Sequence, residues 1–176
     1  MNPNPVLEAI RRRRSIRHYT DEPIAEETLQ QILEAGLIAP SSRAIRPCEF
    51  ILVTDRDTLK AMAGFRDTSA QMLSEATAAI VVLADRTKSD VWAEDASIAM
   101  AYMHLAADAL GLASCWVQGR LRTAGPESSE AYLRRLLHYP ESYALEAVLA
   151  LGHATYRPKP REVTPELRAK IHRERF

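Results

Sequence analysis

The sequence predicts a single domain of the α+β or α/β class, in which helices cover both faces of a small sheet. The first observation is size, because 176 residues with 47% hydrophobic and 26% charged content are enough for one substantial core. The second is the alternation of helix-type and strand-type hydrophobic patterns along the chain. The third is the lack of repeats and low-complexity tracts, so residues 1–176 are treated as one domain with residues 154–176 as a C-terminal arm and helix.

The first helix is expected directly after Asn4. Asn4 is a good N-cap, and Pro5 suits the first helical position. Val6, Leu7 and Ile10 recur at helical spacing and form one apolar face. The arginines of the run "RRRRSIRHYT" therefore fall on the last turn of this helix and just beyond it.

Four short apolar runs predict buried strands, and segments between them predict helices. The strands are expected at residues 49–54, 78–84, 112–118 and 144–154. The helices are expected at residues 25–36, 57–64, 67–77 and 130–139.

The segment 94–111 predicts a long helix with apolar residues on nearly every face. Such a helix belongs in the middle of a protein or in a subunit interface. Glu94 and Asp95 are adjacent, so they diverge by about 100° on a helix and cannot act as a facing carboxylate pair. They are expected to begin the helix, where acids favour the positive end of its dipole.

The C-terminal segment begins as a proline-rich arm, which is expected to cross another surface because it cannot pack as an ordinary helix. Thr164 is expected to cap a basic terminal helix with Pro165 in its first turn.

Composition excludes several classes of protein. The formal net charge is zero, which disfavours a nucleic-acid-binding face. The two cysteines have no metal-ligand or redox spacing, and no stretch resembles a leader or a membrane span, so we expect free thiols, no metal and a cytoplasmic location. No HExxH, GxSxG, GxxxxGK[ST] or GxGxxG motif is present, and the chain has only six glycines.

Single residues offer little catalytic chemistry. The five histidines are scattered, and each is expected to be a surface residue or a satisfied core residue. Cys115 lies inside an apolar strand pattern with no evident partner, which favours a structural cysteine over a nucleophile.

The basic cluster after the first helix is the strongest signal for a ligand. An extended "SIR" would direct Ser15 and Arg17 to the same side, next to the guanidinium groups of Arg13 and Arg14. Bidentate arginine contacts suit a phosphate monoester, which has nearly two charges and three acceptor oxygens. A solvated charged face is the alternative, and we expect it for Arg11 and Arg12.

Four ordered segments resemble the nitroreductase-type FMN oxidoreductases. They are "RRRSIRHY", "APSSRAIRPCEFILVTD", "WAEDASIAMAYMHLAADALGLASCW" and "ALEAVLALGHATYRPKPR". The resemblance spans about residues 6–161 and implies a nitroreductase-like α+β fold, with a small mixed β-sheet flanked by helices in an intertwined homodimer. It further implies two FMN molecules at the subunit interface, NADH or NADPH as the reductant, and a small organic acceptor such as a nitroaromatic or a quinone.

The resemblance also implies roles for single residues. Arg13, Arg14 and Ser15 would hold the FMN phosphate and ribityl chain, and Lys159 and Arg161 would close on the phosphate from the arm. The flavin ring would be contacted by Arg17 at its N1/O2 edge, by the backbone of Gln118 and Gly119 near N5, and by Pro40, Ser41 and Ser42 of the other subunit. Hydride would pass from NAD(P)H through N5 to the acceptor in a two-step exchange.

Some residues depart from the family pattern. Ala44, Arg46, Cys48 and His153 stand where asparagine, glutamine, tryptophan and tyrosine are usual. These changes bear on the acceptor more than on the cofactor. Two alternatives stay open: a flavin-binding sensor or carrier without efficient turnover, and a nucleic-acid or acidic-partner binder that uses the basic patches.

Overall fold

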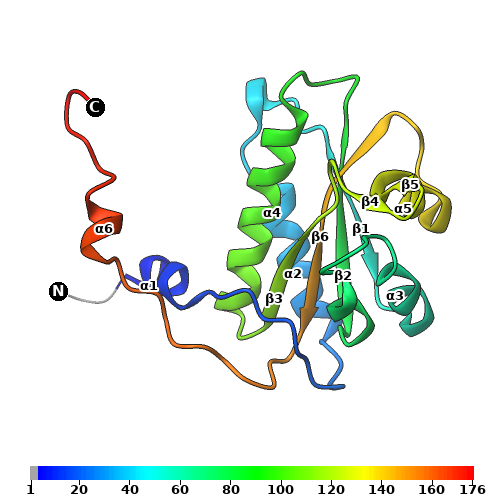
Figure 1. Cartoon of the computed structure of the whole chain (residues 1–176), viewed down its shortest axis with the longest axis horizontal. Coiled ribbons are helices and arrows are strands. Elements are labelled where there is room, and N and C mark those ends of the chain that lie inside the picture. The colour runs from blue at the N-terminus through cyan, green and yellow to red at the C-terminus, as the bar shows by residue number, and fades with distance from the viewer. Residues whose placement is uncertain (1–3) are drawn as a thin grey trace.

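The computed structural model describes residues 4–176 and is built on a four-stranded sheet in the order β1-β2-β6-β3 (Figure 1). The strands are β1 (Cys48–Val53), β2 (Ala78–Asp85), β3 (Ala113–Gln118) and β6 (Tyr143–Gly152). All three strand pairs are antiparallel. The expected mixed character is confined, among the described residues, to one isolated parallel bridge between Ser15 and Ser114.

Helices cover both faces of the sheet, as predicted. The helices α2 (Glu26–Leu37) and α4 (Trp92–Ala109) pack on one face, and α3 (Arg56–Met62) and α5 (Ser129–Leu137) on the other (Figure 1). Every residue of β2 is buried, which explains why its sequence is a continuous apolar run rather than an alternating one.

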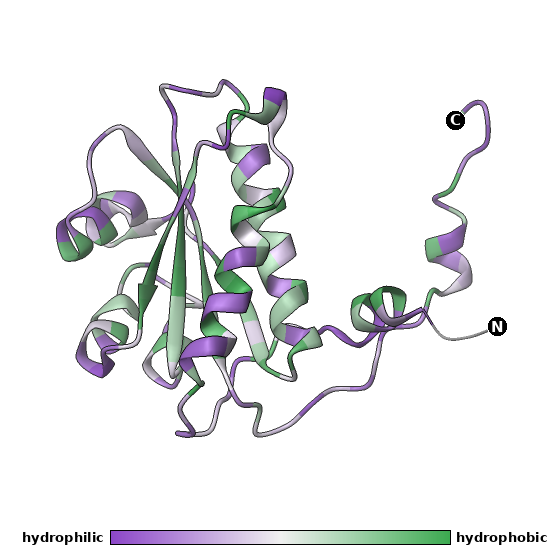
Figure 2. Ribbon diagram, turned by 180° about the vertical axis from the view of Figure 1, so that it is seen from behind, coloured by the Kyte–Doolittle hydropathy of each residue, from purple (hydrophilic) through white to green (hydrophobic). Residues whose placement is uncertain are grey.

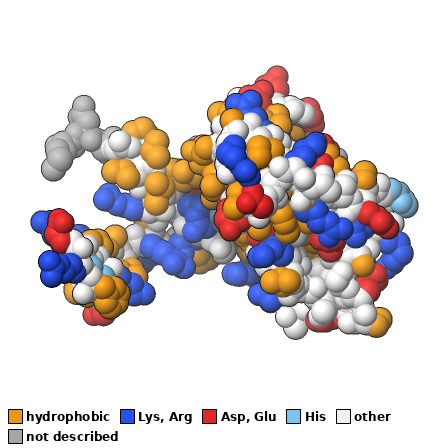
Figure 3. Space-filling view, turned by 90° about the horizontal axis from the view of Figure 1, so that it is seen from above, with side chains coloured by type: hydrophobic (Ala, Val, Ile, Leu, Met, Phe, Trp, Pro, Cys, Tyr) orange, Lys and Arg blue, Asp and Glu red, His pale blue; other side chains and the backbone are white. Residues whose placement is uncertain are grey.

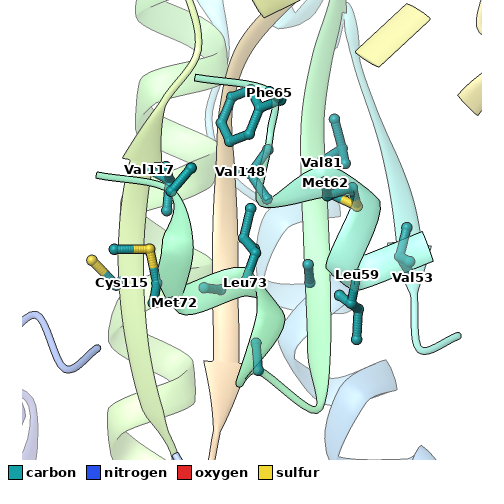
Figure 4. Packing of buried hydrophobic residues seen from close by; sticks show 14 of the residues in the cluster. Val53, Leu59, Met62, Phe65, Met72, Leu73, Val81, Cys115, Val117 and Val148 are labelled. Atoms are coloured by element: carbon teal, nitrogen blue, oxygen red, sulfur yellow. The ribbon is translucent and has the colours of Figure 1, made fainter. Parts of the chain in front are cut away.

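Alternate side chains of the strands supply the two cores. Ile80 and Val82 face α2 and α4, whereas Val81 faces α3 and the neighbouring 3-10 turn. Figure 4 shows Val81, Val117 and Val148 of the sheet packed against the side chains around Leu73. The hydropathy colouring shows largely apolar strands between helices that carry both apolar and polar residues (Figure 2).

The first helix begins as the sequence predicts. In α1 (Pro5–Arg12) the Asn4 side chain accepts hydrogen bonds from the N–H groups of Val6 and Leu7, at 3.0 and 3.2 Å. The apolar face of α1 is not covered by the chain, since Val6 is 57% and Ile10 52% exposed.

The central helix has two apolar faces in different environments. Met100 and Met103 are fully buried against the sheet. On the opposite side, Ile98 and Tyr102 are more than one-third exposed. The absence of a polar stripe in its sequence therefore reflects one face in the core and another that the single chain leaves open.

Two predicted helices are much shorter than expected. Residues 67–77 form only the 3-10 turn η2 (Gln71–Ser74), in which the Ser74 hydroxyl donates to the Gln71 carbonyl at 2.7 Å. The terminal helix α6 is limited to Pro165–Arg168, capped by Thr164 as predicted but without a core to pack on, since Leu167 is 48% exposed. The small hairpin β4 (Thr123–Ala124) and β5 (Glu127–Ser128) was not predicted.

Within residues 4–176, no helix combines the length and the hydropathy that a bilayer span requires.

Candidate functional site

The two ends of the chain lie side by side and run in opposite directions. The Arg161 N–H donates to the Arg11 carbonyl at 3.0 Å, and the Thr20 N–H donates to the His153 carbonyl at 2.9 Å. Figure 1 shows this as the adjacent blue and orange segments below α4. The structure therefore brings the predicted phosphate ligands of the N-terminal segment next to those of the proline-rich arm.

This junction carries uncompensated positive charge. The Arg14 guanidinium donates to the Lys159 carbonyl at 2.5 Å, which ties the two segments together. Within the described part of the chain, the side chains of Arg14, Arg17, Lys159 and Arg161 form no ion pair with a carboxylate. Lys and Arg side chains gather where the chain ends meet the body (Figure 3). Such a junction can stabilise a dianionic group.

Ser15 and Arg17 point to the same side, as the extended "SIR" predicts. Ile16 between them is buried, whereas both flanking residues are exposed. They line a shared cavity of about 220 Å³ whose far wall comes from the arm, at Thr155 and Tyr156. A hydroxyl and a guanidinium thus face one space between the two ends of the chain.

Arg13 is held by a buried histidine near the C-terminal end of α4. Arg13 Nη1 lies 2.8 Å from His104 Nε2, and His104 Nδ1 lies 2.6 Å from Ser114 Oγ. Since arginine only donates, Nε2 accepts, and the ring proton sits on Nδ1 and is donated to Ser114. Burial, aided by the Arg13 charge, lowers the pKa of His104 to about 4, so the ring stays neutral.

One turn further along α4, Asp108 gathers two more arginines. Its buried carboxylate accepts from Arg12 Nε at 2.9 Å and from Arg157 Nη1 at 3.5 Å. Arg12 is exposed, as expected, with its side chain 49% accessible, and Asp108 holds one side of its guanidinium. Sequence reasoning did not single out Asp108 or the partner of His104, although two polar residues at i and i+4 on an apolar helix were a usable signal.

The other predicted flavin ligands lie at the opposite end of α4. The Ser42 N–H donates to Asp95 Oδ1 at 2.7 Å, and the Arg46 N–H donates to Ser41 Oγ at 2.9 Å. Pro40 and Ser41 line a cavity of about 270 Å³ with Arg46 and Asp95. Asp95 lies in the first turn of α4, as predicted, and it also anchors this loop.

The loop after Ser42 is conformationally strained. Arg43, Ala44 and Arg46 have φ values of +52°, +55° and +52°, a region that favours glycine. The hydrogen bond from Ser42 to Asp95 holds the start of this segment. The loop is therefore maintained against its own backbone preference.

Within one chain, the predicted ligands at residues 40–42 do not lie next to those at the junction of the chain ends. Asp95 precedes His104 by nine residues and Asp108 by 13, so about 14 to 20 Å of helix separates the two ends. Pro40, Ser41 and Ser42 thus lie far from the junction of the chain ends.

Gln118 and Gly119 lie at the end of β3. The Gly119 N–H donates to the Glu146 carbonyl at 3.1 Å, and Gln118 Nε2 donates to the same carbonyl and to Glu146 Oε1, each at 3.2 Å. A Cβ on Gly119 would lie 2.5 Å from Leu145 Cδ2, so no larger residue fits here without a shift. Packing therefore accounts for this glycine, and its N–H is engaged within the chain.

Neither cysteine has the character of a nucleophile. Cys115 is buried in β3, and burial raises the pKa of its thiol. Burial and the nearby Asp95 raise the pKa of Cys48 to about 12. Both thiols are therefore protonated near neutral pH, and this favours the structural role predicted for Cys115.

Comparisons with known proteins converge on one family. The model of the nitroreductase family matches residues 10–90 and 64–153. A putative NADH dehydrogenase/NAD(P)H nitroreductase of Archaeoglobus fulgidus is 41% identical over 151 residues, which are 84% of each chain. The fold is similar to an FMN-dependent nitroreductase from Clostridium difficile R20291, with a TM-score of 0.94, 38% identity, and 97% and 99% of the two chains covered. A putative nitroreductase from Desulfovibrio desulfuricans in complex with FMN gives a TM-score of 0.78 at 32% identity, with 99% of each chain covered.

Proposed function

The chain belongs to the nitroreductase family, and on that premise we propose that it uses FMN to pass hydride from NADH or NADPH to a small organic acceptor. It is an NAD(P)H-dependent oxidoreductase. The acceptor class that we propose is a nitroaromatic, a quinone or a similar compound. The observation that carries the proposal is the junction of the two chain ends, where Arg14 donates to the Lys159 carbonyl beside the cavity that Ser15 and Arg17 line.

The junction of the chain ends fits the phosphate of FMN. A dianion needs paired donors to offset its loss of hydration. Within residues 4–176, Arg14, Lys159 and Arg161 of this junction have no carboxylate partner, whereas Arg12 and Arg157 pair with Asp108. We assign Arg13, Arg14 and Ser15 to the phosphate and ribityl chain, with Lys159 and Arg161 from the arm.

When bound, FMN supplies the redox chemistry, and the protein supplies binding, orientation and electrostatics. In our proposal Arg17 sets a fixed positive charge at the N1/O2 edge of the ring, which favours an electron-rich ring. We place Gln118 and Gly119 beside N5. The Gly119 N–H would have to share its bond to the Glu146 carbonyl in order to donate there. Because Ala44 has no polar side chain, it cannot contact the ring as an asparagine would.

We propose a twofold homodimer as the active unit. A copy of α4 running in the opposite direction would bring Pro40, Ser41 and Ser42 of one subunit toward the chain-end junction of the other. The exposed apolar residues of α1 and α4 support this, since they line a groove of about 520 Å³ that includes Val6, Tyr102 and Leu105.

The proposal is tested by the colour of the purified protein. We expect a yellow protein that NADH or NADPH bleaches under anaerobic conditions and that an added acceptor restores. A yellow protein whose flavin is bleached by neither NADH nor NADPH would instead be a flavin carrier. A colourless protein that does not take up added FMN would refute the proposal.

Two variants separate the assigned roles. Arg17→Ala should slow flavin reduction more than it weakens FMN binding. The double change Arg13→Ala and Arg161→Ala should lose FMN, because charge is removed from both chain ends. Arg135→Ala is the control, since this α5 residue pairs with Glu127 away from the junction. The reverse ordering of the two effects in an FMN titration would contradict the assignment.

A further inference from the structure

A second cavity rich in arginine lies beyond the end of β3. Its volume is about 400 Å³, and Gly119 forms part of its wall. Three guanidinium-bearing residues line it: Arg86, Arg120 and Arg122. Trp92, the first residue of α4, adds an aromatic wall, and the Arg120 guanidinium lies 5.5 Å from the centroid of that ring.

The charge of this cavity is positive. Among the described residues Glu130 is the one carboxylate that lines it, and it lies 3.8 Å from Arg86. Glu130 already accepts from Arg134 at 2.7 Å and from the Leu145 N–H at 2.9 Å. Arg120 and Arg122 have no carboxylate partner within residues 4–176. The Arg122 guanidinium donates to the Leu121 carbonyl, which leaves most of its donors free.

A strained turn presents the two arginines. The Arg122 N–H donates to the Gly119 carbonyl at 3.1 Å, and the Arg120 N–H donates to the Glu146 carbonyl at 2.9 Å. Leu121 between them has φ +58° and is 80% exposed, an unfavourable conformation for a branched apolar residue. Strain that the surrounding bonds impose in this way is typical of ligand clamps.

We propose that this cavity binds the phosphate groups of the reductant, with Arg120 and Arg122 as the main ligands. The inference rests on the proposed function and identifies where the polar end of NADPH or NADH is recognised. Guanidinium groups match phosphate oxygens in charge and in fork geometry. Gly119 belongs both to this cavity and to the segment that we place beside flavin N5, so a dinucleotide held here has its nicotinamide end near the reactive ring.

The arginines could recognise either the 2′-phosphate of NADPH or the pyrophosphate that NADPH and NADH share, and kinetics distinguish the two. Arg120→Gln, Arg122→Gln and the control Arg135→Gln are compared in anaerobic flavin reduction by NADPH and by NADH. The loss of one charge-assisted contact should raise the KM of a cavity variant about 10-fold. A rise for NADPH alone identifies the 2′-phosphate, and a rise for both identifies the pyrophosphate.

A phosphate-free reductant separates this inference from the proposed function. 1-Benzyl-1,4-dihydronicotinamide carries the reacting ring without phosphates, so it should reduce the flavin of every variant at the wild-type rate. If neither this compound nor NADPH nor NADH reduces the wild-type flavin, the proposed function fails. If this compound reduces the flavin of a cavity variant as slowly as NADPH does, the cavity assignment fails.

Binding without turnover gives an independent readout. Calorimetric titration of the flavin-loaded protein with NADP⁺ and NAD⁺ should show weaker binding in the cavity variants, and added salt should weaken wild-type binding more than variant binding. Equal dissociation constants and equal KM values for both nucleotides in wild type and cavity variants would overturn the proposal.

Discussion

The two ends of α4 use their polar residues differently. At the N-terminal end, Asp95 accepts from the Ser42 N–H and from the Ser89 hydroxyl, at 2.7 and 3.1 Å. At the C-terminal end, His104 and Asp108 accept from the guanidinium groups of residues that lie far away in sequence. One end therefore fixes the shape of a loop, and the other end collects positive charge.

This difference indicates at which end of α4 the loss of an acceptor should lower stability more. At the N-terminal end the donors are the half-buried Ser42 N–H and the buried Ser89 hydroxyl, so losing their acceptor should lower stability. At the C-terminal end the arginines reach solvent, with exposed fractions of 49% for Arg12 and 37% for Arg157, so water can replace part of a lost contact.

The largest effect on stability is expected when acid protonates His104, near the C-terminal end of α4. The pKa of His104 is about 4 in the folded protein, below its ordinary value of 6.5. Between these values the unfolded chain binds a proton that the folded chain does not, so stability is full above pH 6.5 and decreases as the pH falls toward 4. The total decrease should be about 3 kcal/mol.

Urea unfolding at pH 4 to 7 measures this decrease. His104→Gln should flatten the stability profile in that window, whereas His172→Gln, at an exposed position, should leave the wild-type slope. Equal slopes in wild type and His104→Gln would show that this ring does not control the acid response.

Asp95→Ala tests the N-terminal end of α4, where Asp95 holds the loop at Ser42. We expect a loss of about 2 to 3 kcal/mol in the free energy of unfolding, because the Ser42 N–H and the Ser89 hydroxyl lose a charged acceptor. Asp90→Ala is the matched control, since Asp90 pairs with Arg43 at the surface and its side chain is 78% exposed. The comparison of the two ends fails if both variants lose the same stability.

Asp108→Asn should cost less, about 1 to 2 kcal/mol, because its two arginine partners can be hydrated. Limited proteolysis should cut the arm near Arg157 sooner than in wild type. The control is Asp57→Asn, whose exposed carboxylate pairs with Lys60 on one helix. An unchanged cleavage rate would mean that Asp108 does not hold the arm.

Ala44→Gly should give the smallest effect and the opposite sign. Glycine adopts the φ of +55° at this position without strain, so stability should rise by about 0.5 to 1 kcal/mol. The same substitution at Ala106, inside α4, should lower stability by about 1 kcal/mol. Thermal unfolding of both variants measures whether each substitution raises or lowers stability. A loss of stability in Ala44→Gly would contradict the inference that the backbone is strained at this position.

Local patterns predicted the elements whose signals are contained in short segments. The Asn4 cap, the four sheet strands and the long helix α4 were predictable because capping and hydrophobic period are written in neighbouring residues. The alternation of Ser15 and Arg17 around Ile16 was predictable for the same reason.

Tertiary contacts account for what the sequence did not predict. The pairing of His104 with Ser114 depends on how α4 packs on β3, and the contacts of Asp108 depend on the return of the arm. Likewise, the turn at Leu121 brings Arg120 and Arg122 to one cavity through a left-handed residue that no propensity favours. The length of α6 was overestimated because a basic helical pattern does not provide a surface to pack on.

The bridge between Ser15 and Ser114 has a consequence for solubility. The strand β3 ends the sheet on one side, and the Ile16 N–H donates to the Ser114 carbonyl at 3.0 Å there. The segment after α1 thereby shields part of an open strand edge from other chains. A truncated protein that starts after Arg17 would lose this shield, and self-association through β3 would accompany the loss of its phosphate ligands.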